Sequence, residues 1–345
     1  MPETKPLPKL ESLIDQRNAV KNLTSVIRRD TIPHAFLFTG NEGAGKRTAA
    51  ITFVMACNCD ENRIVSSFSE ASIDKVTGSC GKCRSCRKIL SGNHPDVIFI
   101  KPSGTFIKIS QIRELCAQLA VKPYEKGYRA VIISDAGTMN KEAGNALLKI
   151  LEEPPERTII ILTAFQMSDL LPTIVSRCRH VRFSPVSKEK ISSFLTKKHG
   201  VDVGRANVIA SMAEGSFTRA LEMNKGNWLH VRRRLIQEME ELQSGRILPC
   251  LMFAERLAGK KELVQYSLEI IKNWFRDLIV YKYSPEKVLN QDLVERVEAA
   301  SEKVEVKTLM SKIRAIQKAQ KAIDANANLR LTLENFAMEI VSLRQ

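Results

Sequence analysis

The chain has 345 residues, which is too long for one ordinary domain and fits two or three. Its apolar fraction of 44% is typical of a folded globular protein, and no apolar run approaches the roughly 20 residues needed to cross a bilayer. The first residues, Met1–Lys5, carry an acid and lack the apolar stretch of a secretory signal, so we expect a cytoplasmic protein with no membrane partner. The net charge of +15 fits a nucleic-acid partner and fits equally a solvated basic surface.

The first half of the chain alternates strand and helix signals. An entry segment and one amphipathic helix occupy residues 1–33, and a short apolar run at 35–39 predicts a strand. A glycine-rich turn and a helix from Lys46 to Cys57 follow. Further strand patterns lie at 97–100, 130–134 and 158–163, with helical patterns at 109–121 and 141–151 between them. This alternation predicts a parallel sheet with helices on both faces.

Only helical periodicity is found from Ser187 to the C-terminus. We therefore predict an α/β domain over residues 1–184, a small helical lid over 185–228 and an all-α domain over 229–345. The segment Val304–Ile323 predicts a basic amphipathic helix, and a solvated face for its lysines, Lys312 among them, is favoured over direct DNA contact.

The sequence GNEGAGK at Gly40–Lys46 lies between a predicted strand and a predicted helix. That setting predicts a phosphate-binding P-loop. Gly40, Gly43 and Gly45 would then place backbone N–H groups around phosphate oxygens, and Lys46 would reach the terminal phosphates. The alternative is an ordinary glycine-rich turn with an exposed lysine.

Two positions of this nucleotide site depart from an active ATPase. Arg47 follows the lysine where a Ser or Thr hydroxyl should bind Mg²⁺, and a guanidinium has no lone pair to offer a metal. Asp135 ends the predicted strand, as the second metal-site carboxylate should, but Ala136 stands where a glutamate should polarise water. We expect no intrinsic turnover, while binding of ATP or ADP at this degenerate site stays open.

Cysteines at three-residue spacing predict a metal site. Cys80, Cys83 and Cys86, with Cys59 upstream, can surround one Zn²⁺ with four thiolates, and such a site is structural because no coordination position stays open. Cys57 competes as fourth ligand, and a chance cluster or a redox pair is the alternative to zinc. Eight cysteines in a cytosolic chain argue against a disulfide framework. The ligands belong to a module inserted at about 59–90.

Several stretches in this order resemble the AAA+ clamp-loader family of bacterial DNA polymerase III. They are HAFLFTG at 34–40, the cysteine cluster after the P-loop helix, NALLKILEEPPE at 145–156 and SRC at 176–178. Within the family, GNHPD at 92–96, Arg47 and Ala136 resemble the delta-prime type rather than the ATP-hydrolysing gamma/tau type. The resemblance covers about residues 10–185.

The resemblance implies an AAA+ domain and a C-terminal collar that joins subunits into a heteropentameric ring. Its partners would be gamma/tau-type ATPase subunits and a delta-type subunit, and the ring would load the sliding clamp onto primed DNA. Arg177 would be an arginine finger presented in trans to a neighbour's ATP. Thr163 matches a sensor position and is expected to be structural here. The rivals are a gamma/tau-type ATPase, and a zinc-containing DNA-binding protein with a vestigial P-loop that binds DNA tightly by itself.

Overall fold

The computed structural model of the chain describes residue 10 and residues 13–29, 31–61, 78–225, 228–242, 246–259 and 264–342. The chain forms two compact units, one of Met1–Ile191 with Glu214–Thr218 and the other of Ser192–Ala213 with Arg219–Gln345. We call them the first and the second unit. The predicted domain boundaries at 184 and 228 describe a finer division, which stays a prediction.

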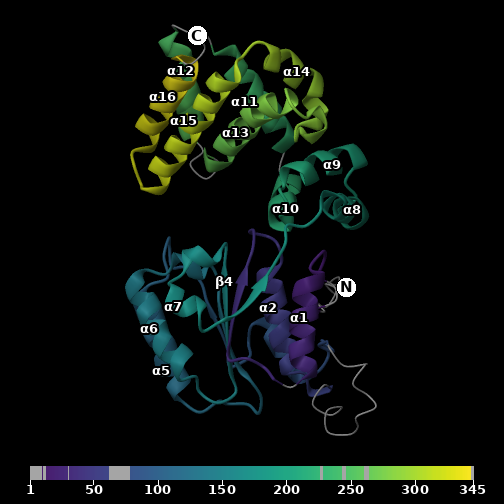
Figure 1. Cartoon of the computed structure of the whole chain (residues 1–345), viewed down its shortest axis with the longest axis vertical. Coiled ribbons are helices and arrows are strands. Elements are labelled where there is room, and N and C mark those ends of the chain that lie inside the picture. Colours follow the sequence, from purple (N-terminus) through teal and green to yellow (C-terminus); the bar gives the residue numbers. More distant parts are fainter. Residues whose placement is uncertain are drawn as a thin grey trace. The chain divides into compact units, whose positions relative to one another are not determined.

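A five-stranded parallel sheet forms the centre of the first unit, as predicted (Figure 1). Its strands are β1 (Ala35–Thr39), β2 (Val97–Ile100), β3 (Arg129–Ile133), β4 (Thr158–Ala164) and β5 (Arg179–Arg182), in the order β2-β3-β4-β1-β5. β1 is fully buried between β4 and β5. β5 was not predicted, because only Val181 of its residues is buried and the segment therefore lacks an apolar pattern.

Helices cover both faces of the sheet (Figure 1). Those against one face are α1 (Arg17–Arg28), α2 (Lys46–Cys57) and α4 (Arg84–Ser91), and those against the other are α5 (Ile109–Ala120), α6 (Lys141–Glu152) and α7 (Pro172–Val175). Alternate residues of β1 serve the two cores, Phe36 on one face and Leu37 on the other, because successive strand side chains point in opposite directions. Two short 3₁₀ turns, Ala136–Thr138 and Met167–Asp169, follow β3 and β4.

Among the described residues the second unit is all helical, as predicted. Its helices are α8 (Lys188–His199, which begins in the first unit), α9 (Val203–Met212), α10 (Phe217–Lys225), α11 (Trp228–Glu241), α12 (Ile247–Ala258), α13 (Val264–Tyr281), α14 (Val294–Glu302), α15 (Val306–Asp324) and α16 (Leu329–Ser342), with 3₁₀ turns at Pro285–Lys287 and Gln291–Leu293. None of the helices in the described ranges is both long enough and apolar enough to span a membrane.

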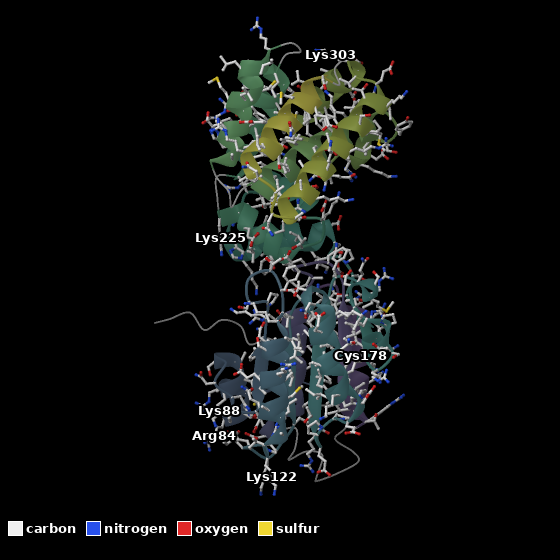
Figure 2. The ribbon with its side chains drawn as sticks, turned by 90° about the vertical axis from the view of Figure 1, so that its left-hand side faces the viewer. Arg84, Lys88, Lys122, Cys178, Lys225 and Lys303 are labelled. Atoms are coloured by element: carbon white, nitrogen blue, oxygen red, sulfur yellow. The ribbon has the colours of Figure 1, made fainter. Side chains whose placement is uncertain are left out.

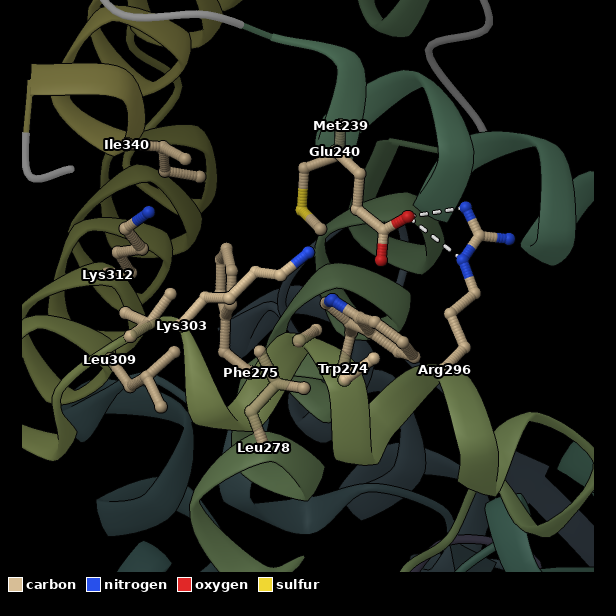
Figure 3. Close-up of a pocket in the computed structure, with 13 residues that line it drawn as sticks. Met239, Glu240, Trp274, Phe275, Leu278, Arg296, Lys303, Leu309, Lys312 and Ile340 are labelled. Carbon is tan, nitrogen blue, oxygen red and sulfur yellow. Dashed lines mark hydrogen bonds and ion pairs between the residues drawn. The ribbon is translucent and has the colours of Figure 1, made fainter.

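α15 corrects one sequence expectation. Lys312 is only 3% exposed, and its Nζ lies 5.5 Å from the centroid of the Phe275 ring, so it faces the core rather than solvent. Figure 3 shows Lys312 and Phe275 at a cavity of about 480 Å³, where the Glu240 carboxylate accepts hydrogen bonds from the Arg296 guanidinium. The ammonium is tolerated there because its stem packs on apolar side chains and the ring face attracts the cation.

A buried polar network joins residues 289–292 to helices α11 and α13 within the second unit. Asp277 is fully buried, and its carboxylate accepts hydrogen bonds from Leu289 N (3.0 Å), Asn290 N (2.8 Å) and Asn290 Nδ2 (2.6 Å). Arg232, also fully buried, donates to Asn290 Oδ1 at 2.8 Å and forms an ion pair with Asp292. Because each buried charge has partners, removing one of them leaves the others uncompensated.

Candidate functional site

The predicted P-loop follows β1 and opens α2. Gly40, Gly43 and Gly45 have φ values of +143°, +70° and +92°, a backbone conformation that side chains other than glycine rarely adopt. Gly45 is the N-cap of α2, so the loop presents the amino end of this helix. The local fold is therefore that of a phosphate-binding loop.

The lysine of the loop is turned back onto the loop itself. Lys46 Nζ donates to the carbonyl oxygen of Gly40 and to that of Asn41, the latter at 2.9 Å. Burial lowers the pKa of Lys46, and the charges of Asp135 and Glu42 offset part of this. The ammonium is thus held by carbonyl oxygens of its own loop.

The segment Glu214–Thr218 returns to the first unit and lies against the P-loop. Phe217 N donates to the Gly43 carbonyl at 3.2 Å. A Cβ atom added at Gly43 would lie 2.1 Å from Ser216 Oγ and 2.9 Å from Thr218 N, so this close approach requires glycine. The start of α10 therefore occupies the space beside the middle of the loop.

A cavity of about 560 Å³ adjoins the loop and has the size of a small-ligand pocket. Its ionisable lining groups are the ammonium of Lys46 and the carboxylates of Glu42, Asp135 and Asp169. Asp135 has φ +52°, and its backbone N–H donates to Thr163 Oγ1 at 3.1 Å. Thr163 thus has a structural contact here. The excess of carboxylates disfavours a polyphosphate unless a cation accompanies it.

Neither Arg47 nor Ala136 supplies the metal ligand or the water-activating group that an ATPase site needs. Arg47 is exposed, and its guanidinium carbon lies 6.0 Å from the centroid of the Phe99 ring. Ala136 is fully buried at the end of β3 and has no group that could polarise water. Lys46 and Asp135 therefore line one cavity, to which neither Arg47 nor Ala136 adds a hydroxyl or a carboxylate.

Arg177 follows the short helix α7 and lies at the surface of the first unit. Its guanidinium forms a 2.9 Å ion pair with Glu152, at the end of α6, and donates to the Thr173 carbonyl at 3.0 Å. The side chains of Arg177 and Glu152 are 37% and 50% exposed, so the pair is weak and solvent-screened. The guanidinium is thus oriented but remains accessible to a partner.

The four predicted metal ligands converge. The Sγ atoms of Cys59, Cys80, Cys83 and Cys86 all lie within 4.8 Å of one another, and Cys57 is outside this group. A tetrahedral zinc–thiolate site places its sulfurs about 3.8 Å apart, so the four thiols fit one Zn²⁺. Backbone N–H groups of Cys83 and Cys86 point at the sulfurs of Cys80 and Cys83, at 3.3 and 3.4 Å, and would orient the thiolates.

The segment GNHPD at 92–96, which in the sequence is only a family marker, has a structural role: its side chains hold the loop 121–128. His94 is buried, with Nε2 3.4 Å from a Glu125 oxygen and Nδ1 accepting from Asp96 N at 3.2 Å. The Asp96 carboxylate accepts the backbone N–H groups of Tyr124 and Glu125 at 2.9 and 2.7 Å. The sequence signal for this role is a His-Pro-Asp turn beside a strand. The loop that it holds, which contains Tyr124 and Glu125, lies about 30 residues away and could not be identified from local sequence.

Comparison with known proteins identifies the family of the chain. A family model described as the delta subunit of DNA polymerase III matches residues 15–187, and a second model, for the C-terminal part of that subunit, matches residues 226–341. The solved structure of a DNA polymerase III gamma-subunit-related protein from Thermotoga maritima is 21% identical, with a TM-score of 0.45, over 96% of this chain and 100% of that one.

Curated relatives are also subunits of DNA polymerase III. The DNA polymerase III subunit delta' of Bacillus subtilis is 27% identical over 94% of this chain and 95% of its own length. The delta' subunit of Pseudomonas aeruginosa is 35% identical over 42% of this chain and 41% of its own length. The tau subunit of Bacillus subtilis is 28% identical over 96% of this chain but only 61% of its own length. The chain therefore belongs to the clamp-loader subunit family of DNA polymerase III.

Proposed function

We propose that the chain is a delta-prime-type clamp-loader subunit that does not hydrolyse ATP. The proposal depends above all on the nucleotide site. Arg47 replaces the Mg²⁺-binding hydroxyl and Ala136 replaces the catalytic carboxylate, while Lys46 is bonded to its own loop. These changes remove the metal and water activation on which phosphoryl transfer depends.

The catalytic contribution would then be made to another subunit. Arg177 is exposed, lies on the first unit near the end of a helix, and is oriented by one weak ion pair. A guanidinium delivered across an interface can stabilise the charge that develops on a neighbour's γ-phosphate, and such fingers accelerate hydrolysis about 10³- to 10⁵-fold. In this role the chain would sit in a heteropentameric ring with gamma/tau-type and delta-type subunits, act in the cytoplasm, and help load the sliding clamp onto primed DNA.

The proposal has a direct test in the assembled complex. Arg177→Ala should lower DNA-stimulated ATP hydrolysis at least about tenfold at the site that this residue faces, without preventing assembly. Arg177→Lys should recover little activity, because an ammonium lacks the planar fork of donors. Arg182→Ala, which removes an exposed arginine from β5, is the control. Unchanged hydrolysis in the Arg177→Ala complex would remove the finger.

The rival assignment is an ATP-hydrolysing gamma/tau-type subunit, since tau and gamma subunits are also among the relatives. Phosphate release by the isolated chain separates the two. We expect a rate near background, and a turnover of about 1 s⁻¹ or more would favour the rival.

A further inference from the structure

A loop at the amino ends of the strands exposes large side chains, and the proposed function does not explain their exposure. It connects α5 to β3 over residues 121–128. The Tyr124 side chain is 81% exposed and that of Val121 59%. A single exposed apolar residue needs no explanation, but an exposed tyrosine and valine on one short loop merit one.

Hydrogen bonds fix this loop at three places. The buried Arg129 guanidinium donates to the carbonyls of Leu119 (2.8 Å) and Val121 at the start of the loop. The Asp96 carboxylate holds its middle through the backbone N–H groups described above. The side chain of Asn58 accepts from Tyr128 N at 2.9 Å and donates to Tyr128 O at 3.1 Å at its end. The Tyr124 ring is therefore displayed by an anchored backbone.

Cationic residues lie in the same loop and on the neighbouring helix α4. Lys122 and Lys126 flank Tyr124 in the loop, and both are exposed. Arg84, Arg87 and Lys88 lie at positions i, i+3 and i+4 of α4, which places them on one side of that helix. Figure 2 shows Arg84, Lys88 and Lys122 together at one end of the first unit.

The loop and the helix are joined at this end. The Lys88 ammonium donates a hydrogen bond to the Glu125 carboxylate and forms an ion pair with it. This hydrogen bond lowers the pKa of the Glu125 carboxyl, and the charges of His94 and Arg84 lower it further. Glu125 is the one acidic residue within 121–128, and it is already paired with Lys88. We call the set Arg84, Arg87, Lys88, Lys122 and Tyr124 the basic–aromatic surface.

We propose that the basic–aromatic surface binds single-stranded DNA. Cations on both sides of the ring would contact successive phosphates, and Tyr124 would stack on an unpaired base. An acidic protein segment would satisfy the cations but gives no reason for an anchored, exposed ring. Duplex DNA has no free base face to offer that ring. The inference goes beyond the proposed function, because it concerns DNA contact rather than ATP hydrolysis.

The test is the affinity of the full-length chain for a fluorescent oligonucleotide of about 20 thymidines, measured by anisotropy. We expect a dissociation constant of about 1–100 μM at physiological salt, as for other sequence-independent contacts. Tyr124→Ala should weaken binding about tenfold, and Tyr124→Phe should restore it because the ring is kept. The double variant Arg84→Ala/Lys122→Ala should reduce the steepness of the salt dependence by about 1.4 in logarithmic units.

Two controls remove matched groups elsewhere. Tyr283→Ala deletes a tyrosine that is 73% exposed in the second unit, and Lys21→Ala/Arg28→Ala deletes two exposed cations of α1. Both should bind like the unaltered chain. The proposal is wrong if Tyr124→Ala binds normally, if the α1 variant loses as much as the double variant, or if polyglutamate competes as well as the oligonucleotide does. Failure here leaves the Arg177 experiment unaffected, because that experiment measures ATP hydrolysis.

Discussion

At the scale of single residues, Arg47 is the clearest difference from an active ATPase site, because it stands where a Mg²⁺-binding hydroxyl is needed. Its replacement by serine is therefore the first substitution to test. Arg47→Ser returns a hydroxyl to the metal-binding position, yet we expect no gain in phosphate release by the isolated chain. Ala136 still supplies no carboxylate, and Ser216 still lies beside Gly43. Removal of an exposed arginine should change stability by less than about 0.5 kcal/mol, so folding does not obscure the result.

Phosphate release and thermal unfolding of Arg47→Ser measure these two quantities. Arg47→Ala is the matched control, because it removes the guanidinium without adding a metal ligand. A clear burst of hydrolysis in the serine variant alone would show that the site is intact apart from this one residue.

Residue identities could be assigned from sequence where they depend on local spacing. Gly40, Gly43 and Gly45 have the positive φ values that a glycine-rich turn needs, and Lys46 and Asp135 line one cavity. What the sequence could not predict is the direction of long side chains. Lys46 turns back to its own loop and Lys312 turns into the core, because the free energy of each choice depends on groups far away in the chain.

At the scale of elements, strong apolar patterns predicted β1 to β4 and the helices α2, α5 and α6, whereas α4 was not predicted. β5 was not predicted, because an edge strand with one buried residue has no alternation of apolar and polar residues to detect. The contact of Glu214–Thr218 with the P-loop was not predicted either. The two segments are about 170 residues apart in the chain, and no local sequence pattern indicates that they meet.

The cysteine module supplies the prediction that belongs to this scale. Purified without chelator, the chain should carry about one equivalent of zinc by atomic absorption, and Cys83→Ser should carry less than about half of that. The loss should be accompanied by easier proteolysis at α4, because the metal would no longer link this helix to Cys59 and Cys80. Zinc should also be released as pH falls, since protons compete for the thiolates.

Cys116→Ser is the control for this experiment. Cys116 is a free cysteine on α5 outside the four-sulfur group, so its replacement should leave the zinc content unchanged. Full zinc occupancy in Cys83→Ser would show that the remaining thiols or another group hold the metal without Cys83.

At the scale of the whole molecule, the chain has two compact units with separate cores, so heat unfolding should not be a single two-state transition. Scanning calorimetry should resolve two transitions, and a perturbation within one unit should move one of them. Asp277→Ala acts on the second unit, where it strands the buried N–H groups of Leu289 and Asn290. The expected cost is about 3 kcal/mol, which lowers one Tm by roughly 6–12 °C.

Removal of zinc acts on the first unit and should lower the other transition, so the two perturbations together assign both peaks. Asp277→Asn keeps an acceptor for the stranded N–H groups and should shift its transition less than alanine does. If Asp277→Ala lowered both transitions equally, the units would unfold as one cooperative block. The proposed role of Arg177 would then be coupled to the packing of the second unit, and variants of that unit could alter ATP hydrolysis by a neighbour without touching either site.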